Sequence, residues 1–114
     1  AYDIYLIFNE LIKNDTFINI INQSSYKVEY TDRNGNKKTM NLKTTNLYLR
    51  EEKTPPENMQ IIGGKTGVTY KAGNCLILLS KDSLNNQYIS LVLKASDSDK
   101  LYSDMSNLLS LISN

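Results

Sequence analysis

The chain has 114 residues, which is enough for one domain with a modest core and too few for two. Thirteen basic and twelve acidic residues give a net charge of +1, which argues against a dedicated nucleic-acid-binding protein. Histidine is absent and Cys75 is the sole cysteine, which excludes a histidine-based catalytic triad, a histidine- or cysteine-rich metal site and an internal disulfide.

The N-terminal part of the chain predicts two helices. Residues 2–13 carry apolar side chains at helical spacing, and these form a stripe that we expect to face a core: Ile4, Ile7, Phe8, Leu11 and Ile12. Asn14-Asp15 interrupt the pattern and can cap a second short helix, whose inner face would carry Phe17, Ile20 and Ile21. Apolar runs are far shorter than the roughly 20 residues that a membrane-spanning helix needs.

The next segment predicts a β-hairpin and a loop. Tyr26, Val28 and Tyr30 alternate with polar residues, which indicates a half-buried strand. Asn34-Gly35 follows in a polar loop, and a return strand is expected over residues 38–42. Residues 51–58 contain two prolines and four charged residues and therefore predict a loop.

The second half predicts three strands and a helix. Residues 59–66 are typical of a strand that closes at the glycine-rich stretch 63–67, and residues 75–79 and 88–93 are apolar runs of strand length. Ser96-x-x-Asp99 resembles a capping box before a helix with an apolar stripe formed by Leu101, Tyr102, Met105, Leu108, Leu109 and Ile112. Since short turns join antiparallel strands, the expected class is α+β, an antiparallel sheet with flanking helices, and residues 1–114 form a single domain or a fragment of one.

Lys65-Thr66-Gly67 is the candidate for chemistry. A lysine ammonium and a threonine hydroxyl at a strand edge can both donate hydrogen bonds to a substrate carboxylate. Glycine lets a substrate backbone lie against the strand, and the N–H of Val68 can act as one oxyanion-hole donor. Three residues alone also fit an ordinary surface turn. Glu57 is a candidate acid–base partner for Lys65, at a distance that the sequence does not fix.

The context of this motif resembles a known family. Residues 64–67 are Gly-Lys-Thr-Gly and residues 72–76 are Ala-Gly-Asn-Cys-Leu, an order similar to the third-motif region of D-alanyl-D-alanine carboxypeptidases. Thr45-Asn46, the helix start at Ala1-Tyr2-Asp3 and the closing Ala95-Ser96 also resemble that family. The resemblance covers nearly the whole chain and implies a partial penicillin-binding-protein fold, transpeptidase-like or β-lactamase-like.

The resemblance also implies an activity and its residues. The parent protein would be a serine-type D-Ala-D-Ala carboxypeptidase that cleaves peptidoglycan stem peptides through an acyl-enzyme, with no metal or organic cofactor. Lys65 and Thr66 would bind the terminal carboxylate, Gly67 would lie beneath the substrate, and Lys65 and the Val68 N–H would take part in catalysis. We expect Tyr70, in the following turn, to rim the substrate groove.

Two further family motifs have only look-alikes here. Ser24-Ser25-Tyr26-Lys27 fits Ser-x-x-Lys but lies in an alternating run, whereas the chemistry needs a helix face. Ser83-Leu84-Asn85 fits Ser-x-Asn but lies in a polar turn after Lys65, the wrong order for the family. We therefore expect this chain to be the C-terminal part of a longer catalytic domain and to be inactive alone.

The expected partners follow from the same resemblance. They are a stem peptide ending in D-Ala-D-Ala and, for the complete domain, inhibitory β-lactams; nucleic acid is not expected. Without further strands, residues 88–93 would form an unpaired sheet edge that favours homo-oligomers. The resemblance implies a location on the extracellular side of the cytoplasmic membrane. The alternatives are a related β-lactamase or transpeptidase, and a non-catalytic module that binds peptides or cell-wall fragments.

Overall fold

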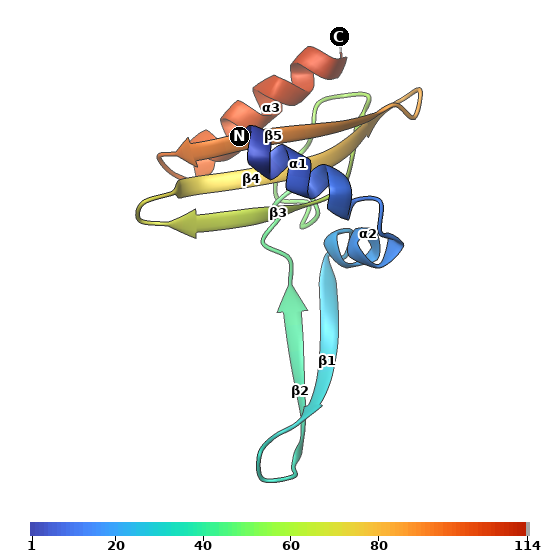
Figure 1. The fold of residues 1–114 in the computed structure, drawn as a ribbon, viewed down its shortest axis with the longest axis vertical. Helices are drawn as coiled ribbons and strands as arrows, with labels where there is room; N and C mark the ends of the chain where they lie inside the picture. The colour runs from blue at the N-terminus through green and yellow to red at the C-terminus, as the bar shows by residue number, and fades with distance from the viewer. Residues whose placement is uncertain (114) are drawn as a thin grey trace.

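A computed structural model describes residues 1–113, which form three helices and five strands (Figure 1). In chain order the elements are α1 (Tyr2–Leu11), α2 (Asp15–Ile21), β1 (Ser25–Thr31), β2 (Lys37–Lys43), β3 (Met59–Thr69), β4 (Gly73–Asp82), β5 (Gln87–Ala95) and α3 (Ser98–Ser113). The predicted α+β class with antiparallel sheets and flanking helices is confirmed. No helix within residues 1–113 is long and apolar enough to cross a membrane.

The strands form two separate antiparallel sheets. β3, β4 and β5 make a three-stranded sheet in that order, so β4 is central and β3 and β5 lie at its edges. β1 and β2 pair only with each other and project from the body as a hairpin (Figure 1). α1 and α2 lie on one face of the larger sheet and α3 on the other, which gives three layers.

The core consists of two apolar clusters, one on each face of β4. Leu76 and Leu78 face α3 and pack with Met105 and Leu109, which are fully buried. Ile77 and Leu79 face the other way and pack with Phe8 of α1 and Ile21 of α2. Burial on both faces explains why β4 is a continuous apolar run and not an alternating one.

β3 continues through its glycines to Thr69, so the predicted strand end at residue 66 was wrong. A Cβ at Gly63 would lie 2.5 Å from the backbone oxygen of Ile21, and one at Gly64 would lie 2.2 Å from that of Ile77. The register with β4 shifts between Ile61 and Gly63. These glycines therefore admit α2 and β4 close to the β3 backbone and do not end the strand.

Several predicted inner faces are exposed in the structure. Of the α1 stripe only Phe8 is buried, while Ile4, Ile7 and Leu11 are 43%, 58% and 41% exposed. The hairpin is open on both faces, and among the alternating residues of β1 only Val28 is half-buried. The periodicity predicted these helices and strands correctly, but no other helix or strand within residues 1–113 covers the exposed faces of α1 and the hairpin.

The cap of α3 also differs from the prediction. Asp97, not Ser96, accepts a hydrogen bond at the helix start, from the Lys100 N–H at 2.7 Å. The Asp97 carbonyl accepts the first helical bond from the Leu101 N–H at 3.0 Å. The helix therefore begins two residues after Ser96, and an aspartate supplies both the cap and a favourable negative charge.

Candidate functional site

The Lys-Thr-Gly motif lies in the C-terminal half of β3, at an edge of the three-stranded sheet. The helix α2 packs against the first half of this strand, where the Asn22 side-chain amide donates a hydrogen bond to the Ile62 carbonyl. Beyond that point Lys65, Gly67 and Val68 are exposed. The motif is thus presented on a paired, rigid strand with accessible side chains.

Lys65 carries its charge at the surface. Its ammonium donates a hydrogen bond to the carbonyl of Thr66, and the ion pairs found within residues 1–113 do not include it. The suggested pairing of Lys65 with Glu57 is therefore not formed. An exposed ammonium without an internal carboxylate remains able to bind an external anion.

Thr66 and Gly67 have different surroundings. Thr66 is half-buried, and its hydroxyl forms a hydrogen bond with the hydroxyl of Thr45, which comes from the segment before β3. A Cβ built on Gly67 would meet nothing within 4 Å. Gly67 is therefore not required by packing inside this chain, in contrast to Gly63 and Gly64.

A small cavity of about 190 Å³ joins part of the motif to the α3 side of the sheet. It is lined by Thr45, Leu47, Thr66, Gly67, Val68, Asn74, Cys75, Ser98, Leu101 and Tyr102. Lys65 does not line it. Tyr70 stands fully exposed in the β3–β4 turn, also outside this lining, so its role at a groove rim stays a prediction.

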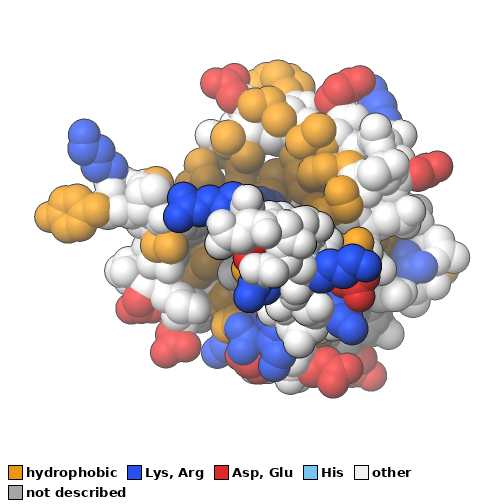
Figure 2. All heavy atoms as spheres, turned by 90° about the horizontal axis from the view of Figure 1, so that it is seen from below, with side chains coloured by type: hydrophobic (Ala, Val, Ile, Leu, Met, Phe, Trp, Pro, Cys, Tyr) orange, Lys and Arg blue, Asp and Glu red, His pale blue; other side chains and the backbone are white. Residues whose placement is uncertain are grey.

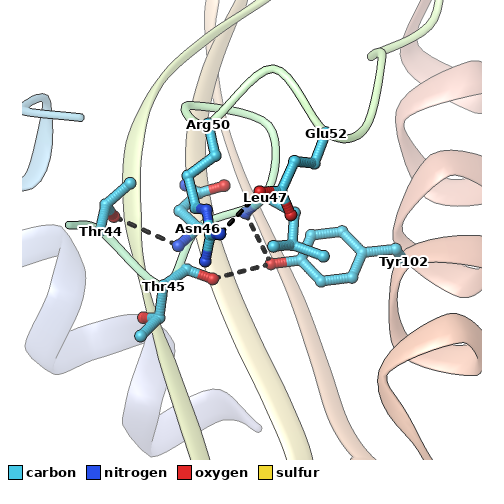
Figure 3. Close-up of polar contacts among 7 residues, drawn as sticks. All are labelled: Thr44, Thr45, Asn46, Leu47, Arg50, Glu52 and Tyr102. Carbon is cyan, nitrogen blue, oxygen red and sulfur yellow. Dashed lines mark hydrogen bonds and ion pairs between the residues drawn. The ribbon is translucent and has the colours of Figure 1, made fainter.

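The segment before β3 is held by two tyrosines that were not predicted as site residues, Tyr102, which Figure 3 shows, and Tyr48. The Tyr102 hydroxyl of α3 accepts a hydrogen bond from the Leu47 N–H at 3.0 Å and donates one to the Thr45 carbonyl at 3.4 Å. Tyr48 bonds Ser106 at 2.9 Å, and its ring packs edge-on against Tyr102. Burial raises the pKa of both phenols, so both hydroxyls stay protonated.

Sequence signals for these two residues were weak. Tyr102 was expected as an apolar member of the last helix, and helical spacing cannot show that its hydroxyl binds a loop. Tyr48 lies in a segment without helical or strand periodicity. The one available signal was Thr45-Asn46, whose Asn46 is buried and accepts a hydrogen bond from the Tyr48 N–H.

The look-alike motifs lie on other elements. Lys27 belongs to the exposed strand β1 and Ser24 lies in the bend just before it, while the Ser83–Asn85 stretch lies in the turn between β4 and β5. A hollow of about 510 Å³ lies where the hairpin meets α2, and neither Ser24 nor Lys27 lines it. Within residues 1–113, no group of three or more acidic, histidine or cysteine side chains could hold a metal ion.

Comparison with known proteins decides the family. The D-alanyl-D-alanine carboxypeptidase family, peptidase S11, matches residues 1–97. This chain belongs to that family. Comparison with curated proteins gave no significant match.

Among solved structures, this chain is similar to the R248L mutant of the Streptomyces K15 DD-transpeptidase. The TM-score is 0.73 at 26% sequence identity, and the match covers 87% of this chain. It covers 36% of the Streptomyces protein, so the chain spans about a third of that length. The resemblance and the partial penicillin-binding-protein fold expected from sequence are confirmed.

Proposed function

We propose that this chain supplies the substrate-binding strand of a serine-type D-Ala-D-Ala carboxypeptidase that acts on peptidoglycan stem peptides. The observation that carries the proposal is the surface of β3, where the exposed Lys65 ammonium, the Thr66 hydroxyl and the open Gly67 follow one another on an edge strand. Membership of the peptidase S11 family supports the assignment of these residues to a peptide carboxylate.

Each group has a defined role in this proposal. The terminal D-Ala carboxylate accepts hydrogen bonds from Lys65 and Thr66. The serine nucleophile attacks the penultimate carbonyl, the Val68 N–H donates to the developing oxyanion, and the terminal D-Ala leaves with a proton. Water then hydrolyses the ester and regenerates the serine. The serine and its base belong to a segment of the parent protein other than these residues.

A transpeptidase is the second candidate, favoured by the structural match to the Streptomyces DD-transpeptidase. Both reactions share the acyl-enzyme and the carboxylate site, and they differ in whether water or an amine accepts the acyl group. Since peptidoglycan stem peptides lie outside the cytoplasmic membrane, the proposal includes an extracellular location for the parent protein. It also includes inhibition by β-lactams, because they resemble the same dipeptide end.

The carboxylate role can be tested on the chain itself. We expect a short peptide ending in D-Ala-D-Ala to shift the backbone NMR signals of residues 65–68, because its carboxylate binds there. Thr66→Val and Lys65→Gln should each weaken this binding about tenfold or more, since hydrogen bonds to charged groups are the strong ones. The control is the same peptide with an amidated C-terminus, and equal shifts with both peptides would refute the role.

The proposal that the nucleophile lies outside this chain gives a second test. We expect the chain incubated with a penicillin to show no covalent adduct by mass spectrometry. Lys27 lies on strand β1 and Ser24 directly precedes that strand, so the pair lacks the helical arrangement that activates serine. A stable acyl adduct on Ser24, Ser25 or Ser83 would instead show that this chain carries its own catalytic serine.

A further inference from the structure

We infer that Thr45 is a positioning residue for the Thr66 hydroxyl, and that Tyr102 of α3 holds Thr45 in this position. The inference rests on the proposed function, since Thr66 is the hydroxyl that would bind the substrate carboxylate. It extends the binding site from β3 to the loop before it and to the helix on the far face of the sheet.

Tyr102 holds the loop before β3 in a fixed position. The Tyr102 hydroxyl bonds two consecutive peptide units, at the Leu47 N–H and the Thr45 carbonyl (Figure 3). Tyr102 is 3% exposed, and its ring centre lies 5.3 Å from that of Tyr48, whose hydroxyl forms a hydrogen bond with Ser106. Two buried aromatic side chains therefore fasten the backbone at Thr45 to α3.

The number of hydroxyl protons limits which hydrogen bonds Thr45 and Thr66 can donate. A threonine hydroxyl has one proton to donate and can accept further bonds. The hydrogen bond recorded for the Thr45 side chain within residues 1–113 is the one to Thr66, and the same holds for the Thr66 hydroxyl. If Thr66 donates its proton to a carboxylate, Thr45 must be the donor in the bond between them.

One proton on each hydroxyl sets the direction of both hydrogen bonds. With a ligand bound, hydrogen bonds run from the Thr45 hydroxyl to the Thr66 oxygen and from the Thr66 hydroxyl to the carboxylate. Each bond in such a chain polarises the next one and so strengthens it. Thr45 is exposed, so its hydroxyl is not needed to satisfy a buried group, and its effect should pass through Thr66.

The orientation of Thr66 tests the inference without any ligand. We expect three-bond couplings from the Thr66 methyl carbon to report one rotamer in the wild type and in Thr45→Ser. They should report an average of rotamers in Thr45→Val, which keeps the shape and removes the donor, and in Tyr102→Phe. Thr39 on the hairpin is the control, and its couplings should stay constant. Thr66 couplings that stay unchanged in Thr45→Val would overturn the inference.

Binding of the D-Ala-D-Ala peptide gives an independent readout. Thr45→Val should weaken binding about three- to tenfold, with recovery in Thr45→Ser. In a Thr66→Val background, Thr45→Val should have no further effect, because its contribution passes through the missing hydroxyl. An equal loss in both backgrounds would contradict the inference. If Thr66→Val itself leaves binding unchanged, the proposed function fails, while the rotamer result still decides the position of Thr45.

Discussion

At the scale of single residues, the glycines of β3 differ in what requires a small residue: packing within the chain or room for a ligand. Gly63 admits the backbone of α2, and Gly64 admits the backbone of β4. Gly67 faces open space within this chain, so the requirement for a small residue there would come from a ligand. Gly63 and Gly64 are therefore needed for folding, whereas Gly67 would be needed for binding.

This contrast predicts opposite outcomes for two alanine variants. Gly63→Ala should lower the free energy of unfolding by about 1–3 kcal/mol, because the new methyl group meets the Ile21 backbone. Gly67→Ala should change it by no more than about 0.5 kcal/mol. Chemical denaturation of both proteins measures these values.

Peptide binding then completes the comparison. Gly67→Ala should weaken binding of the D-Ala-D-Ala peptide although the protein is fully folded. A Gly67→Ala protein that binds as well as the wild type would remove the argument for backbone contact at this position.

At the scale of elements, two of the three hairpins within residues 1–113, β1–β2 and β4–β5, close with the same turn. Asp32 accepts hydrogen bonds from the N–H groups of Asn34 and Asn36, and Asp82 accepts them from those of Leu84 and Asn86. The fourth residue of each turn, Gly35 or Asn85, has a positive φ. The Asn-Gly signal found the first turn, while the second lacks glycine and relies on asparagine, which tolerates this conformation.

The second turn predicts a pH dependence. The hydrogen bond from the Asn86 side chain, with those from the Tyr88 hydroxyl and two backbone N–H groups, lowers the pKa of Asp82. The resulting stabilisation is present above the unfolded-state pKa of about 4 and is lost as the pH falls through the lower folded-state value. The stability difference between wild type and Asp82→Asn should therefore shrink below about pH 4.

Urea denaturation across this pH range measures the effect. Ser83→Ala in the same turn is the control, because it removes no titrating group and its effect should not vary with pH. A constant difference between wild type and Asp82→Asn from pH 6 to pH 2 would contradict the assignment.

At the scale of the whole molecule, much apolar surface lacks a cover within the described residues. On α1, Tyr2, Leu6 and Ile7 are 69%, 45% and 58% exposed, and Leu93 of the edge strand β5 is 41% exposed. Figure 2 shows hydrophobic side chains gathered in a hollowed area of the face seen from the hairpin end. Such surfaces mark places where another polypeptide packs.

These surfaces predict self-association of the isolated chain. β5 pairs with β4 on one side only, and its other edge is a template for a strand of a second copy. We expect dimers or larger species by light scattering, with a shift toward monomer in Leu93→Lys, which places a charge on that edge. The control is Leu84→Lys in the exposed β4–β5 turn, which should leave the distribution unchanged. A monomer over a wide concentration range would contradict the prediction.

The sequence by itself determined the order and type of the elements, the antiparallel class and the family, because these depend on local periodicity and on motifs with fixed spacing. It also identified Lys65, Thr66 and Gly67 as candidate site residues and Thr45-Asn46 as part of the family resemblance. The extent of β3 past its glycines was missed, since glycine signals a turn unless another backbone is known to lie against it. Only the tertiary structure decided which apolar faces are covered, and that Tyr102 reaches the loop at Leu47, 55 residues away along the chain. The physical reason is that burial and hydrogen bonding between distant segments depend on how the layers pack, which no local pattern encodes.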